Sequence, residues 1–329
     1  MPSDKKFTHI RKSQVATVKD DPAEHPGMQD THAADPLSLH GVVPPTVTAF
    51  AQDESLDPQG TAAHARFVVD GGAHAVFPLG TNGEFALLSP EERDRVVEAV
   101  VDEVGGEVPV IAGVGAPSTR ETVARAEAAA ATGADGLVVV TPYYYPLDAT
   151  GAVEHYRRVA EATDLPIYVY HIPSKTGNAL ALETLDEIAA IESVAGLKDS
   201  SKDVPWLGQA IDAHPELTFM AGSDSLLFAG LEIGCTGLVS AVANVFPELV
   251  GDLYDAYAAG EEERARELQS RVYDVRDALK RGPYMAGVKT ALSLRDVDFD
   301  VGGLRSPLRT MSDGDRAALE DDLRTLDLV

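Results

Sequence analysis

From residue 41 onward, the chain alternates between short apolar runs and longer segments with apolar residues at helical spacing. The runs are rich in β-branched residues and are continuously apolar, which is typical of parallel strands buried on both faces. This pattern predicts a parallel α/β fold. The runs lie at residues 42–50, 75–80, 108–115, 136–142, 166–173, 194–199, 217–222 and 237–241.

The segments between the runs carry helix start and stop signals. SPEERDRVVEAVVDEVGG begins with Ser89, Pro90 and Glu92, which form a capping box with proline at the first helical position. The segment ends at Gly105 and Gly106, and STRETVARAEAAAATGA likewise runs from a Ser/Thr cap to a glycine. Eight strands alternating with helices predict a (β/α)8 TIM barrel, with a doubly wound open sheet as the alternative.

We expect the barrel to span residues 38–245. Residues 246–329 contain further helical segments, which predict a C-terminal helical extension packed on the barrel or on a neighbouring subunit. Residues 1–37 are polar and without apolar periodicity, and predict a disordered N-terminal extension. Met28 is a candidate for the natural start, a hypothesis that N-terminal sequencing of the native protein would test.

The strongly negative net charge excludes some classes of binding partner. The 329 residues include 27 basic and 53 acidic side chains, a net charge of −26, and only nine of the basic residues are lysines. Such a chain repels nucleic acid and anionic membranes. Dispersed acidity with arginine preferred over lysine indicates a halophilic cytoplasm, and an ordinary acidic enzyme is the alternative.

Several site classes are disfavoured by missing motifs. Cys235 is the single cysteine, which excludes an internal disulfide, and its apolar segment predicts a buried filler. The nine histidines form no HxH, HxxxH or HExxH spacing, so we expect no metal. No GxGxxG follows a strand and GxSxG is absent, which disfavours a dinucleotide cofactor and a serine hydrolase.

Membrane and export signals are missing as well. No apolar run approaches the roughly 18 residues of a membrane span, and the N-terminus has no signal-peptide core. We therefore expect a soluble cytoplasmic protein.

Candidate chemistry lies at the carboxyl ends of the runs, where the active site of a TIM barrel is built. Lys198 ends the sixth run, and burial in the barrel mouth would lower the pKa of its amine and free a nucleophile for Schiff-base formation. The alternative is a lysine that reaches solvent or pairs with Asp199.

Two further stretches follow strands. GTNGE, residues 80–84, has Thr81 and Asn82 between glycines and could direct backbone N–H groups at a small carboxylate, although a tight turn explains it equally. TPYYYP, residues 141–146, offers a phenol for general acid–base catalysis. Because side chains alternate along a strand, only one or two of its tyrosines should face the cavity, while the others wall it or stack across a subunit interface.

These stretches together resemble the pyruvate-dependent class I aldolases and lyases related to dihydrodipicolinate synthase and N-acetylneuraminate lyase. The likeness covers residues 41–295 and depends on GTNGE, TPYYYP, YHIPSKTG, GLKD, GSDS and ANVFPE in this order. The resemblance implies that Lys198 forms the Schiff base and that Tyr144 shuttles the proton. It also implies that Thr81 and Asn82 bind the 2-oxo acid carboxylate, where relatives often carry Thr-Thr or Ser-Thr. His171 stands where many relatives have Asn.

The residues after the tyrosines bear on the substrate. Dihydrodipicolinate synthases typically continue as PYYN, a basic residue and proline, whereas this chain has Leu147 and Asp148. That ending is more similar to sialic acid lyase and the archaeal 2-keto-3-deoxygluconate aldolases. The remaining substrate-binding candidates lie at the ends of later runs and are Ser200, Gly222, Asp224 and Ser240.

The resemblance implies a lyase without a cofactor that forms pyruvate and an aldehyde from a 2-keto-3-deoxy sugar acid. The alternatives are a dihydrodipicolinate synthase that condenses pyruvate with aspartate semialdehyde, a related sugar-acid dehydratase, and a silent module that only binds a 2-oxo acid. Family members are often dimers of dimers, so the resemblance also implies a homotetramer.

Overall fold

The computed structural model describes residue 37 and residues 39–329. At its centre lies a seven-stranded sheet in the order β1-β7-β6-β5-β4-β3-β2, in which neighbouring strands are parallel. The strands are β1 Gly41–Val42, β2 Ile111–Gly113, β3 Gly136–Val140, β4 Ile167–His171, β5 Val194–Asp199, β6 Thr218–Ala221 and β7 Gly237–Leu238.

The stretch at residues 74–78 closes this sheet into a barrel. The N–H groups of His74 and Phe77 donate to carbonyls of the segment that contains β1, at 2.8 and 3.0 Å. The carbonyls of Val76 and Pro78 accept from the N–H groups of β2, both at 2.9 Å. Prolines lack an N–H and interrupt regular pairing here, so the second predicted run bonds to both edges without forming a longer ladder. The predicted TIM-barrel architecture is thus confirmed.

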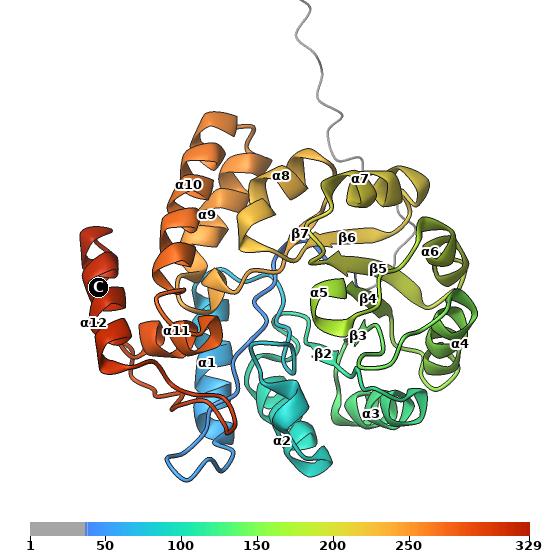
Figure 1. Ribbon diagram of the computed structural model, residues 1–329, viewed down its shortest axis with the longest axis horizontal. Coiled ribbons are helices and arrows are strands. Elements are labelled where there is room, and N and C mark those ends of the chain that lie inside the picture. Colours follow the sequence, from blue (N-terminus) through green and yellow to red (C-terminus); the bar gives the residue numbers. More distant parts are fainter. Residues whose placement is uncertain (1–36, 38) are drawn as a thin grey trace, which may run out of the picture. The chain divides into compact units, whose positions relative to one another are not determined.

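Helices follow the strands and surround the sheet (Figure 1). Around the barrel they are α1 Pro58–Asp70, α2 Pro90–Val104, α3 Thr119–Thr132, α4 Ala149–Ala160, α5 Pro173–Thr176, α6 Leu182–Ala189, α7 Val204–Ala213, α8 Leu227–Glu232 and α9 Pro247–Ala258. Short 3-10 helices are η1 Phe85–Leu87, η2 Asp224–Leu226 and η3 Val242–Asn244. The predicted capping box of α2 is confirmed, because Ser89 Oγ accepts from the N–H of Glu92 and the Glu92 carboxylate accepts from the N–H of Ser89.

The C-terminal helices α10 Glu262–Ala278, α11 Tyr284–Leu292 and α12 Asp313–Thr325 lie together on one side of the barrel (Figure 1). They belong with the barrel to one compact unit, residues 37–329. The limits predicted for the two parts, 38–245 and 246–329, stay a prediction. The extension predicted at residues 1–37, including Met28, lies outside the described residues except for Leu37.

Side-chain alternation divides the core into two layers. Tyr168 and Tyr170 of β4 belong to the cluster in the barrel interior, whereas Ile167 and Val169 pack in the cluster that includes the surrounding helices. Cys235 is a buried free cysteine, as expected for a filler. The alternation directs the last tyrosine of β4 into the barrel mouth.

Candidate active site

The site is centred on Lys198, near the carboxyl end of β5. The strand register pairs Lys198 with Tyr170 of β4, and the Lys198 Nζ atom lies 3.6 Å from the centroid of the Tyr170 ring. The same Nζ atom lies 5.0 Å from the centroid of Phe77. Lys198 is 3% exposed and makes no ion pair with any of residues 37 and 39–329. The amine is therefore enclosed mainly by aromatic rings.

This enclosure changes the acidity of both groups. Burial lowers the pKa of Lys198 from the ordinary lysine value, because the ammonium loses its hydration. Burial raises the pKa of Tyr170, but the nearby Lys198 charge and hydrogen bonding from Ser200 and Thr81 outweigh it, so the pKa of this phenol is lowered. An amine and a phenol that lie this close, and whose pKa values are both lowered, are suited to exchange protons with each other and with a substrate.

Gly222 and Ser200 border the amine on the side of β6. A Cβ atom at Gly222 would approach the Lys198 Cε atom to 2.9 Å and the Ser200 Oγ atom to 2.3 Å. Ser200 donates to the carbonyl of Gly222 at 2.8 Å. Glycine at this position leaves room for the lysine side chain, so both predicted residues lie beside the amine.

The GTNGE turn forms another wall. Thr81 is half-buried, and Asn82 is 7% exposed, with a buried Nδ2 atom that has no partner among the described residues. Both residues line the cavity that contains Lys198. A buried amide N–H without a hydrogen-bond partner reduces stability unless a ligand accepts from it. The turn can therefore bind a carboxylate by donating to it.

Glu84, the last residue of GTNGE, holds this turn to the C-terminal helices. Its side chain is fully buried and forms an ion pair of 2.8 Å with Lys289 of α11. Its other carboxylate oxygen accepts from the N–H of Arg305 at 2.9 Å. Glu84 itself has a left-handed backbone, with φ at 54°. The glutamate is thus an anchor for the turn.

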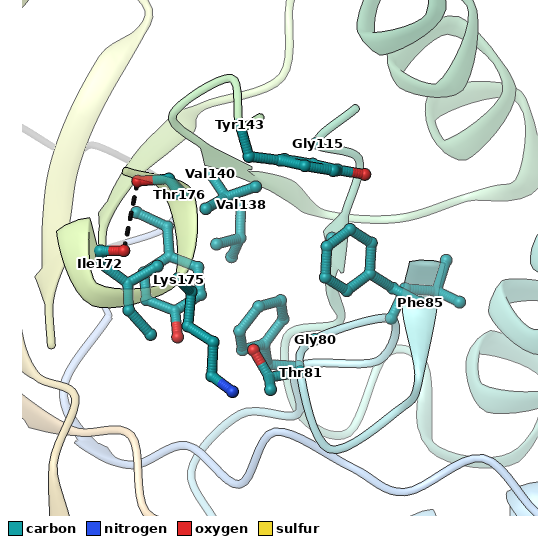
Figure 2. A pocket seen from close by; sticks show the side chains of 14 residues that line it. Gly80, Thr81, Phe85, Gly115, Val138, Val140, Tyr143, Ile172, Lys175 and Thr176 are labelled. Carbon is teal, nitrogen blue, oxygen red and sulfur yellow. Dashed lines mark hydrogen bonds between the residues drawn. The ribbon is translucent and has the colours of Figure 1, made fainter. Parts of the chain in front are cut away.

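Two cavities share Thr81, Tyr170 and Ile172. The first has a volume of about 200 Å³ and is mostly apolar. The rings of Tyr143 and Phe85 line it and pack edge to face, with their centroids 6.2 Å apart. Figure 2 shows this cavity, in which the Lys175 side chain points toward Thr81. The second, of about 210 Å³, contains Lys198 and is more polar. The polar cavity that contains the Lys198 amine is therefore next to an apolar cavity, and the two share part of their lining.

The tyrosine cluster differs from expectation. Tyr144 and Tyr145 are 83% and 72% exposed, and neither lines the two cavities. Tyr144 lies beyond the end of β3 and has φ at 82°, a backbone conformation that a non-glycine residue rarely adopts. The phenol that lies beside Lys198 in the described chain is that of Tyr170, and the catalytic role expected of Tyr144 stays a prediction. Tyr143 alone of the three walls a cavity.

The two remaining predicted ligands form a structural network. Ser240 is fully buried and donates to Asp224 at 2.5 Å, while Tyr284 donates to the other Asp224 oxygen at 2.7 Å. The N–H of Val242 also donates to Asp224, at 3.2 Å. Asp224 borders the cavity while its oxygens accept these hydrogen bonds, and Ser240 is not among the residues that line it. Direct substrate binding by Asp224 and Ser240 stays a prediction.

His171 and Asp199 join the ends of β4 and β5 beside Lys198. The Nδ1 atom of His171 lies 2.8 Å from Asp199, and its Nε2 atom accepts from the N–H of Leu180 at 3.2 Å. These partners imply that Nδ1 carries the proton and donates to Asp199. Asp199 is thus paired with the histidine, and the alternative reading of a Lys198–Asp199 ion pair does not hold.

Sequence reasoning missed Tyr170 and Lys175. Both lie within the quoted motif YHIPSKTG, and the spacing of Tyr168 and Tyr170 in β4 could have indicated two phenols on one face. Among the described residues, no three His, Cys, Asp or Glu side chains gather as a metal site. Within the same part of the chain, every helix is too short or too polar to span a membrane.

Comparison with known proteins places this geometry in context. The model of the dihydrodipicolinate synthetase family matches residues 38–326. An uncharacterized DapA-like lyase of Halobacterium salinarum is 73% identical over 304 residues, covering 91% of this chain and 99% of the relative. A 4-hydroxy-tetrahydrodipicolinate synthase of Methanopyrus kandleri is 36% identical, covering 89% and 98%.

Solved structures of the same family share the fold of this chain. A prophage protein from Escherichia coli K12, described as a member of the dihydrodipicolinic acid synthase family in complex with pyruvate, superposes with a TM-score of 0.84. It is 30% identical, and the match covers 88% of this chain and 99% of that one. The dihydrodipicolinate synthase of Thermotoga maritima has a TM-score of 0.84 at 32% identity, covering 89% and 100%.

Proposed function

Because the chain belongs to the dihydrodipicolinate synthetase family and is a class I lyase, we propose that it cleaves a 2-keto-3-deoxy sugar acid into pyruvate and an aldehyde. The observation that carries this proposal is the buried Lys198 amine in register with the Tyr170 phenol. A desolvated amine is the group that Schiff-base chemistry requires, and a phenol beside it can move the proton.

The reaction begins when the neutral Lys198 amine attacks the C2 ketone and water leaves, which gives an iminium. Tyr170, which becomes a phenolate by giving its proton to the departing water, then accepts the proton of the C4 hydroxyl while the C3–C4 bond breaks. The electron pair of that bond moves into the iminium and forms an enamine, and the aldehyde departs. Tyr170 then gives that proton to C3 of the enamine, and hydrolysis of the resulting iminium releases pyruvate and regenerates the amine. In this scheme Tyr170 is the proton shuttle, the role that the family resemblance implies for Tyr144.

The 2-oxo acid carboxylate is assigned to the GTNGE turn. The Thr81 hydroxyl and the unpaired amide of Asn82 line the cavity that contains Lys198 and can donate to an anion. Asn82 thereby replaces the second hydroxyl that is common in relatives. This supports a 2-oxo acid as the group that approaches the lysine.

Hydroxyl groups in the second cavity support a sugar acid. Ser174, Ser200 and Ser223 line it and can hydrogen-bond a polyol chain. Asp148, after the tyrosines, accepts from the N–H of Gly151 and caps α4. This stretch therefore offers no cation to the substrate.

A specific observation also favours a second candidate, the synthase reaction of pyruvate with aspartate semialdehyde. Lys175 lines the first cavity and points toward Thr81 (Figure 2). Its ammonium can bind the carboxylate of a second substrate, which is the role of the basic residue that typically follows the tyrosines in dihydrodipicolinate synthases. The missing base at Leu147 and Asp148 therefore weighs less against a synthase.

A substrate panel in molar KCl separates the two reactions. We expect pyruvate release from 2-keto-3-deoxygluconate, and none of it from a Lys198→Ala variant. Consumption of aspartate semialdehyde with pyruvate as the faster reaction would contradict the aldolase and favour the synthase. Lys175→Gln provides a further test, because it should reduce the synthase reaction and affect sugar-acid cleavage less.

The proposed enzyme is a homotetramer. The adjacent rings of Tyr144 and Tyr145 are exposed in the single chain, which is unusual for large aromatic side chains and suits a surface that another copy covers. Sedimentation in molar KCl should give a mass near four times 34.8 kDa. A monomer at micromolar concentration would contradict this assignment.

A further inference from the structure

We propose that the substrate carries a second anionic group at the end remote from the 2-oxo acid, and that Arg276 and Lys202 bind it. This inference rests on the proposed Schiff-base lyase and adds the chemical class of its substrate. Both residues line the cavity that contains Lys198, together with Tyr284 and Ser223. A long substrate bound at Lys198 would extend toward these cations.

The scarcity of lysine makes their position informative. Residues 37–329 hold five lysines, Lys175, Lys198, Lys202, Lys280 and Lys289. One is the proposed nucleophile, one is buried against Glu84, and one is paired on the surface with Asp277. The other two, Lys175 and Lys202, line the two cavities. In a chain with a net charge of −26, lysine is thus concentrated where a ligand would enter.

Arg276 reaches the cavity from the C-terminal helix α10. Its side chain is half-buried and makes no ion pair or hydrogen bond with any of residues 37 and 39–329. Two other arginines of this helix, Arg264 and Arg266, form ion pairs with glutamates of the same helix. Arg276 therefore presents an uncompensated guanidinium to the cavity that contains Lys198.

Lys202 reaches the same cavity from the loop after β5. It has φ at 68°, a left-handed backbone that a non-glycine residue rarely adopts. Like Arg276, it has no ion-pair partner within the described part of the chain. Such strained conformations concentrate at ligand sites, where the surrounding structure holds them.

One carboxylate lines this cavity, that of Asp224, and within the described residues it forms no ion pair with Arg276 or Lys202. Asp224 borders the cavity, but its two oxygens accept from Ser240, Val242 and Tyr284. A guanidinium binds phosphate or carboxylate through paired hydrogen bonds, and an ammonium beside it adds a point charge. A phosphate ester or a terminal carboxylate on the aldehyde half of the substrate fits this chemistry, whereas a neutral hydroxymethyl end does not use it.

Aldol addition of pyruvate to three aldehydes tests the inference in molar KCl. The aldehydes are glyceraldehyde, which is neutral, glyceraldehyde 3-phosphate and succinate semialdehyde. We expect kcat/KM for one of the two anionic aldehydes to exceed that for glyceraldehyde by about tenfold to a hundredfold, the range for hydrogen bonds to charged groups. Which of the two is preferred distinguishes a phosphate from a carboxylate.

Variants assign the preference to residues. Arg276→Gln and Lys202→Gln should each reduce the anionic-to-neutral ratio of kcat/KM by about tenfold. Arg271→Gln is the matched control, because Arg271 is an exposed residue of the same helix that does not line the cavity. It should leave the ratio unchanged. Borohydride reduction with pyruvate checks that each variant still forms the Lys198 adduct.

The possible outcomes distinguish a failure of the anionic-substrate inference from a failure of the proposed lyase. Equal kcat/KM for neutral and anionic aldehydes would overturn this inference alone, as would loss of both activities in proportion in Arg276→Gln, or loss of the Lys198 adduct in that variant. An absence of turnover with every aldehyde in the wild-type protein would overturn the proposed lyase together with the inference.

Discussion

At the scale of residues, the assignment with the largest consequence is that of the phenol beside Lys198. Tyr170→Phe should lower kcat by about 10²-fold to 10⁴-fold, because that is the usual contribution of a general acid or base. Steady-state kinetics of sugar-acid cleavage measures it. Tyr144→Phe, which removes the hydroxyl first considered for this role, should have a smaller effect. A larger loss in Tyr144→Phe would contradict the assignment to Tyr170.

The pH dependence of adduct formation follows from the burial of Lys198 beside Tyr170. Burial lowers the pKa of Lys198 from its ordinary value of 10.5, and only the neutral amine attacks a ketone. The rate of adduct formation with pyruvate should therefore fall as the pH drops through this lowered pKa and be constant above it. We expect the acidic limb well below pH 10.5, with an apparent pKa that belongs to the Lys198–Tyr170 pair. A limb at or above that pH would contradict the burial argument.

The same residues show what sequence alone can locate. Lys198 was found because it ends a buried run, where barrel chemistry is placed. The sequence motif favours Tyr144, whereas the contact between Tyr170 and Lys198 depends on the register between β4 and β5. The family motif places a cation directly after the tyrosines, whereas Lys175 reaches the first cavity from α5. Contacts between strands and turns distant in sequence need the fold.

At the scale of elements, the buried ion pair between α11 and the GTNGE turn carries a stability prediction. Lys289 and Glu84 are 3% and 0% exposed at their side chains and 2.8 Å apart. Lys289→Met should reduce the free energy of unfolding by about 3–5 kcal/mol, because it leaves a buried carboxylate without its partner. Denaturant unfolding in molar KCl measures the loss.

A double variant controls for packing. Glu84→Leu combined with Lys289→Met removes both charges, and replacing a buried pair by apolar residues is often close to neutral. The double variant should therefore be more stable than Lys289→Met alone. If both variants lost equal stability, the cost would come from packing and not from the unpaired charge.

Prediction of elements succeeded where local signals are strong. All eight runs occupy positions in the barrel wall, and the capping box of α2 forms as the sequence indicates. Regular pairing at residues 74–78 is less extensive than the apolar pattern suggests, because prolines remove backbone donors on this side. The structural role of Glu84 could not be read from its motif, because its partner Lys289 lies far along the chain.

At the scale of the whole molecule, the charge of −26 predicts a dependence on salt. Salt shortens the screening length from about 10 Å at 0.1 M to about 3 Å at 1 M, which reduces repulsion among the carboxylates. The free energy of unfolding should increase with KCl over this range, as thermal or denaturant unfolding would measure. The similarity to a Halobacterium relative agrees with this expectation. Constant or falling stability with added KCl would contradict it.

The central claim is that Lys198 forms a Schiff base with a 2-oxo acid. Borohydride reduction of the protein with pyruvate, followed by peptide mass mapping, tests it directly. We expect a single reduced adduct on Lys198, and none on Lys175, Lys202 or Lys289. Active protein whose Lys198 stays unmodified under these conditions would contradict the account.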